Sequence, residues 1–165
     1  MIILIIRSKE GEYMGTSMWL ARKINPKRNK DIVVQELIEL LNSIGINSYE
    51  WIKDKYSDDE FYIWKGNPGH GIRVYVGEAE EVIEDNCSFY REIFFDAIYH
   101  DEDDNGDLLL DITYAYMEKY PDILLFGECS KYLYYDKLDI ESVKKSGYSS
   151  DWYFVTKPHV SPIIY

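Results

Sequence analysis

Residues 89 to 120 read FYREIFFDAIYHDEDDNGDLLLDITYAYMEKY and carry the clearest structural signals in the chain. After the acidic patch, apolar side chains recur at helical spacing, at Leu109, Ile112, Tyr116 and Tyr120. Pro121 follows, and proline cannot continue a helix because its ring clashes with the preceding turn. The pattern predicts a helix over residues 108–120. The aromatic run before the patch, residues 89–100, is interpreted as another helix.

Carboxylates line the other face of the helix predicted at 108–120. Positions i, i+4, i+7 and i+11 of an α-helix share one face, and these positions hold Asp107, Asp111, Tyr114 and Glu118. Four further acids stand just before them, at Asp101, Glu102, Asp103 and Asp104. We expect all of these residues to present negative charge to solvent and to form a partner-binding surface.

The acidic patch also fits part of a calcium-binding loop. The first, third, fifth and seventh positions of an EF-hand loop are occupied by Asp101, Asp103, Asn105 and Asp107. The twelfth position requires a bidentate glutamate, and Ile112 stands there instead. The other interpretation is a solvated connector that caps the following helix, with no metal and no cofactor. The sequence leaves both interpretations open.

The pattern along the chain predicts one α+β domain over residues 1–165. With 46% hydrophobic and 29% charged residues, the composition is typical of a globular protein long enough to bury a core. Short runs rich in β-branched and aromatic residues predict strands at 2–7, 18–24, 61–65, 72–76, 123–126, 132–135 and 152–155. We expect a mostly antiparallel sheet with about three to four helices packed on it.

The segment before the helix predicted at 31–44 is the one cluster of positive charge. It reads Asn25-Pro26-Lys27-Arg28-Asn29-Lys30 and is interpreted as an exposed turn, with contact to an anion as the alternative. In the helix that follows, the periodicity places Leu37 on the buried face and Glu36 on the exposed face. Gly45 then stands where a helix C-terminus favours glycine.

Negative charge is concentrated in the middle of the chain. Residues 61 to 128 carry 4 Lys and Arg against 16 Asp and Glu, a formal charge of −12 that equals the charge of the whole chain. Such a field repels nucleic acid and anionic membranes and attracts cationic proteins. We therefore expect a basic protein partner, with solubility as the alternative explanation of the acidity. DNA mimicry is a further alternative for the same surface.

Diagnostic catalytic signatures are missing from the sequence, so a non-catalytic role is favoured, with a metal-binding module or enzyme centred on the acidic loop at 101–111 as an alternative. Cys87 and Cys129 form neither a C-x-x-C pair nor a zinc pattern, which favours a reducing, cytoplasmic location. The histidines stand apart from one another, at His70, His100 and His159. None of the local motifs of serine or cysteine enzymes is present.

Residues 107–126 combine an acidic turn, the helical stretch LLLDITYAY and a Pro-Asp step into a strand. This segment resembles small acidic bacterial proteins of the immunity type, which neutralise a cognate toxin. The resemblance implies a cytoplasmic inhibitor that blocks a basic toxin, often a nuclease. It assigns no functional residue.

Overall fold

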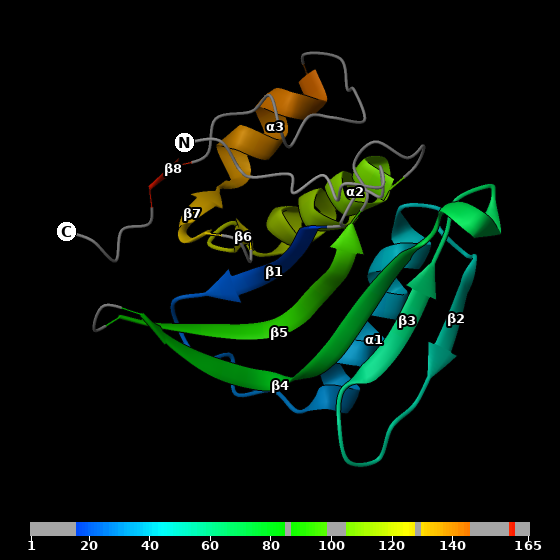
Figure 1. The fold of residues 1–165 in the computed structure, drawn as a ribbon, viewed down its shortest axis with the longest axis horizontal. Helices are drawn as coiled ribbons and strands as arrows, with labels where there is room; N and C mark the ends of the chain where they lie inside the picture. Colours follow the sequence, from blue (N-terminus) through cyan, green and yellow to red (C-terminus); the bar gives the residue numbers. More distant parts are fainter. Residues whose placement is uncertain (1–15, 85–86, 99–104, 128–129, 146–158, 161–165) are drawn as a thin grey trace, which may run out of the picture.

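A computed structural model describes residues 16–84, 87–98, 105–127, 130–145 and 159–160. Within these residues, eight strands form one antiparallel sheet in the order β2-β3-β4-β5-β1-β6-β7-β8 (Figure 1). The strands are β1 (Thr16–Arg22), β2 (Tyr49–Ile52), β3 (Asp59–Ile63), β4 (Ile72–Glu84), β5 (Cys87–Ile98), β6 (Leu124–Gly127), β7 (Ser130–Tyr135) and β8 (His159–Val160). The helices are α1 (Lys30–Ser43), α2 (Asn105–Lys119), α3 (Lys137–Lys145) and a 3-10 turn, η1 (Pro68–His70). The expected α+β class is confirmed.

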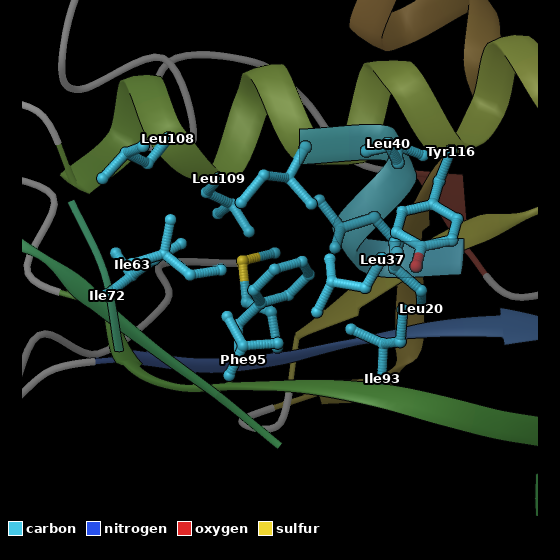
Figure 2. Close-up of a cluster of buried hydrophobic side chains, with 14 of the residues drawn as sticks. Leu20, Leu37, Leu40, Ile63, Ile72, Ile93, Phe95, Leu108, Leu109 and Tyr116 are labelled. Atoms are coloured by element: carbon cyan, nitrogen blue, oxygen red, sulfur yellow. The ribbon is translucent and has the colours of Figure 1, made fainter. Parts of the chain in front are cut away.

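The main hydrophobic core lies between the sheet and two helices. α1 and α2 both pack on the sheet, and α3 lies against α2 (Figure 1). Leu108 and Leu109 of α2 lie between the helix and the sheet, with Leu108 on the side of Ile63 and Ile72, and Leu37 of α1 enters the same cluster (Figure 2). Leu37, Leu109 and Phe95 are fully buried, so truncating one of these side chains to alanine is expected to cost about 2–5 kcal/mol.

Residues 87–98 form strand β5, so the helix predicted at 89–100 is wrong over the described part of that range. β5 pairs with β4 on one side and with β1 on the other. Phe95 belongs to the main core, whereas Phe94 packs in a second cluster, built on Trp19 and Phe126. Both faces of the strand are therefore apolar, and the resulting continuous run hides the two-residue period that would have identified a strand.

The helix predictions at 31–44 and 108–120 are confirmed. The N–H of Ile46 donates to the carbonyl of Leu41 over 2.9 Å, and the N–H of Gly45 donates to that of Asn42 over 3.1 Å. These bonds form the expected glycine-terminated helix end, in which Gly45 has φ +77°. At the other end, the side chain of Asn29 caps α1 by accepting from the N–H of Ile32.

The remaining strand predictions divide into two groups. Those at 18–24, 61–65, 72–76, 123–126 and 132–135 are confirmed with shifted ends, whereas 2–7 and 152–155 lie outside the described residues. The glycine-rich segment 66–71 connects β3 to β4. A Cβ on Gly71 would lie 2.7 Å from the backbone oxygen of Ile63, so this connection requires glycine there.

Candidate functional site

The predicted carboxylate row on α2 faces lysine side chains of the same chain. The carboxylate of Asp111 lies 3.2 Å from Nζ of Lys144 on α3 and 3.6 Å from Nζ of Lys65. Glu118 pairs with Lys137, also on α3, over 3.1 Å. The described carboxylates of the row therefore help to dock α3 on α2. Their role in partner binding stays a prediction.

Tyr114 belongs to the same intramolecular contacts. Its hydroxyl hydrogen-bonds with Glu118, which raises the pKa of Tyr114, and Lys144 lies 4.7 Å from the centre of its ring. The hydrogen bonds from Lys137 and Tyr114 in turn hold the pKa of Glu118 below its usual value. The contacts described for this face of α2 are therefore intramolecular.

The acidic patch is only partly described. Asp101, Glu102, Asp103 and Asp104 lie outside the described residues, as does His100. Asn105 and Asp107 begin α2, but their side chains are not described. Among the described side chains, no group of three or more His, Cys, Asp or Glu is placed to hold a metal ion. The calcium-loop alternative stays a prediction.

Arg28 and Lys30 of the basic turn face inward, which corrects the expectation of exposure for these two residues. Asn25, Lys27 and Asn29 are exposed, as expected. The guanidinium of Arg28 pairs with both Glu36 and Glu92, and its side chain is only 13% exposed. Its Nε donates to Oε1 of Glu92 over 3.1 Å, and its Nη2 donates to the other oxygen, Oε2. Arg28 therefore joins the turn, α1 and β5 through a forked ion pair.

Glu36 is buried, contrary to the sequence-based placement on the exposed face. One of its oxygens pairs with Arg28, and the other pairs with Lys119 and accepts from the hydroxyl of Tyr120. Burial opposes ionisation of Glu36, but these hydrogen bonds outweigh it and lower the pKa of the carboxyl group. With their oxygens bonded, Glu36 and Glu92 are suited to hold elements together rather than to transfer protons.

Lys30 makes the second inward contact of the turn. It pairs over 2.8 Å with Asp59, which is completely buried, and donates to the carbonyl oxygens of Asp54 and Ser57. Nε1 of Trp51 also donates to Asp59, over 2.8 Å. The sequence predicts a surface turn at 57–60, which is wrong for Asp59. These bonds fix the connection between β2 and β3, residues 53–58, against the start of α1.

A cleft of about 810 Å³ opens beside this connection. Residues 55–58 of the connection line it together with Gly77, Glu78 and Glu80 of β4, and Tyr75 and Phe94 add aromatic surface. The volume lies within the range of about 300–1,000 Å³ that is usual for ligand sites. Lys30 and Glu92 also line the cleft, and their ion pairs with Asp59 and Arg28 hold this part of its wall in place.

The ladder between β4 and β5 is irregular at this cleft. Val76 pairs with Ile93 and Glu80 pairs with Arg91, so residues 77–79 of β4 face Glu92 alone. Such a bulge changes the direction of side chains, and here Glu92 meets Arg28. A Cβ on Gly77 would lie 2.1 Å from Oδ1 of Asp58, so glycine allows this carboxylate to lie directly against β4.

Asp58 and Glu78 line the cleft, and Glu81 follows further along β4. These three carboxylates have no ion pair among the described residues, and we name them the acidic edge. All three are exposed. Glu81 accepts only a long hydrogen bond of 3.5 Å from the hydroxyl of Tyr90. Glu80, in contrast, pairs with Arg91. The acidic edge is thus available to cations from outside.

Sequence reasoning missed the acidic edge because it ended the strand at Val76. The residues that follow are an acidic run in the sequence, and the structure shows that β4 continues through them to Glu84. A signal was present in Val82 and Ile83, which resume a strand-like pattern before Asp85-Asn86, a pair typical of turns. The inward contacts of Arg28 and Lys30 have no local signal, since their partners Glu92 and Asp59 are distant in sequence.

Comparison of this chain with family models, with curated proteins and with solved structures finds no match. Among the described helices, none is both long enough and apolar enough to cross a membrane.

Proposed function

We propose that this protein is a non-catalytic acidic binding protein of the immunity type, which neutralises a basic protein by covering it. The partner class is a cationic toxin, for which a nuclease is the leading example because nucleases need positive charge to hold their substrate. The proposal assigns the contact to the acidic edge and the cleft beside it.

The observation that carries the proposal is the uneven use of charge within one structure. Carboxylates in the interior and on α2 are matched by lysines and arginines, as in Glu36 with Arg28 and Asp111 with Lys144. The acidic edge stays uncompensated beside a cleft. Exposed charge of one sign steers an oppositely charged partner and increases its association rate.

Aromatic side chains near the edge supply the apolar part of such a contact. Tyr56 lines the cleft and is 89% exposed, and Trp51 on β2 is 42% exposed. Tyrosine and tryptophan are enriched among the residues that dominate binding energy at protein interfaces. A surface that combines uncompensated carboxylates with exposed aromatics fits a cationic protein better than it fits nucleic acid.

Affinity capture from extract of the native cell, with three baits in parallel, tests the proposal. The baits are the wild-type chain, the variant Asp58→Asn/Glu78→Gln/Glu81→Gln, and a control variant Glu39→Gln/Glu50→Gln/Asp122→Asn. The control removes the same charge at exposed carboxylates on other elements. We expect wild type and control to retain one basic protein that the edge variant loses.

The captured protein is then purified and its activity is measured with and without the wild-type chain. The proposal requires the activity to fall as the chain is added, at a ratio near equimolar. Capture of an acidic protein, equal capture by all three baits, or a partner that stays fully active in the complex would each overturn it.

A further inference from the structure

β4 has an open edge on the side of β3. β3 pairs with β4 from Ile63↔Ile72 to Asp59↔Val76 and no further, whereas β5 accompanies β4 as far as Glu84. The far end of the β4–β5 hairpin accordingly extends past β3 (Figure 1). Among the described residues, the stretch 77–84 of β4 therefore has a strand on one side only. A strand edge of this kind carries N–H and C=O groups that can pair with another strand.

The cleft lies along the beginning of this open edge. β3 begins at Asp59, and the preceding residues 55–58 line the cleft opposite the continuing β4 residues Gly77, Glu78 and Glu80. The ion pair of Lys30 with Asp59 fixes this arrangement. The connection therefore leaves space beside β4 where a further strand would lie if β3 were longer.

We propose that the partner inserts an extended cationic segment into this space, where it pairs with β4 along residues 77–81 as an added strand. This inference rests on the proposed function and specifies its contact. Peptides commonly bind by adding a strand to an exposed sheet edge, with backbone hydrogen bonds supplying affinity and side chains supplying specificity. At a rise of about 3.3 Å per residue, the paired stretch is about 17 Å long.

The side chains around the space define the chemistry of the added strand. Glu78 and Asp58 accept lysine or arginine side chains, and the rings of Tyr75 and Phe94 offer faces for a cation. Charged side chains on an edge also prevent pairing with neutral or acidic strands. Asp58 and Glu78 outnumber Lys55, which also lines the cleft and has no ion pair among the described residues. The excess of negative charge favours a cationic segment and discourages pairing with a second acidic copy of this chain.

Hydrogen exchange of the full-length protein, followed residue by residue by NMR, tests the inference. The probe is a short synthetic peptide of alternating lysine and threonine. Its control is the same peptide N-methylated at alternate residues, which keeps the charge and removes backbone donors on one side. We expect the unmodified peptide to slow exchange at residues 77–81 by about tenfold or more. The N-methylated peptide is expected to leave that exchange unchanged.

The outcomes separate the strand inference from the proposed function. Equal effects of both peptides, protection that maps elsewhere, or no binding of the unmodified peptide would overturn strand addition. Strand addition would also be overturned if the backbone amides of residues 77–81 exchanged as slowly as that of Val74 in the free protein. The edge would then be covered by the chain itself. In each case, loss of capture by the edge variant would still support an electrostatic contact, and its absence would remove the proposed function as well.

Discussion

The interior ion pairs and the acidic edge use the same side-chain types in opposite ways. Arg28, Glu36 and Glu92 are largely withdrawn from solvent, and each carboxylate oxygen has a hydrogen-bond donor. Glu78 and Glu81 are exposed side chains on β4 and pair with no cation among the described residues. The two regions meet opposite the bulge in β4, where Glu92 of β5 contributes both to the interior pair and to the lining of the cleft.

The difference between the two regions shows that formal charge alone does not identify a binding surface. A buried carboxylate with a full set of donors positions secondary structure, and removing one partner leaves an uncompensated charge in the interior. An exposed carboxylate contributes little to folding, because water solvates it and salt screens it. Substitutions in the buried ion pairs should therefore change stability, and substitutions of the exposed carboxylates should change association with a partner.

The largest effect is expected for Arg28→Met. Glu36 and Glu92 would remain buried without their shared cation, so the free energy of unfolding should fall by about 3–5 kcal/mol. Urea denaturation measures this loss. Arg73→Met is the matched control, since Arg73 is 51% exposed and pairs with Glu60 at the surface, and it should cost about 1 kcal/mol or less. Similar losses for the two variants would contradict the contrast between interior and surface pairs.

A smaller effect is expected for Tyr120→Phe. The hydroxyl of Tyr120 donates to Glu36 and accepts from Nη1 of Arg28 over 3.2 Å, and the variant removes both bonds. The free energy of unfolding should fall by about 1.5–3 kcal/mol, the usual range for hydrogen bonds to charged groups. Tyr49→Phe, at a half-buried tyrosine beside the core, serves as the control. A Tyr120 variant as stable as this control would show that the hydrogen bonds of the Tyr120 hydroxyl do not stabilise the fold.

The pH dependence of stability should distinguish the buried carboxylate of Glu36 from exposed carboxylates. The pKa of Glu36 is lowered in the folded protein, so its contribution is present above the pKa of the unfolded chain and is lost as pH falls through the folded value. Thermal or urea unfolding below about pH 4.5 should therefore show a decline that is shallower in Glu36→Gln than in wild type. Glu39→Gln, an exposed neighbour on α1, should retain the wild-type decline. Identical slopes in all three proteins would contradict the assignment.

The smallest effect on stability is expected for Asp58→Asn/Glu78→Gln/Glu81→Gln. Exposed substitutions usually change the free energy of unfolding by less than about 0.5 kcal/mol each, and removing like charges can offset that loss. Urea denaturation should therefore give nearly the wild-type midpoint. A loss comparable to that of Arg28→Met would mean that the edge serves the fold rather than a partner.

Much of the fold follows from sequence, and the reasons for success and failure are local. The end of α1 at Gly45 and that of α2 before Pro121 depend on neighbouring residues, so their signals survive in the sequence. The sequence pattern of β5 predicts a helix because apolar residues stand on both faces of the strand, so that no two-residue period is visible. The candidate site depends on contacts between distant segments, such as Arg28 with Glu92 and Lys30 with Asp59. Patterns within one segment cannot reveal such pairs.

The association rate with the captured partner, measured at about 20 mM and about 500 mM salt, tests the central claim most directly. For wild type and for Glu39→Gln/Glu50→Gln/Asp122→Asn, we expect the rate to fall by about tenfold or more as salt increases. For Asp58→Asn/Glu78→Gln/Glu81→Gln, we expect a slow rate that changes little with salt. Equal salt dependence in all three proteins would contradict the claim that the acidic edge is where this protein meets its partner.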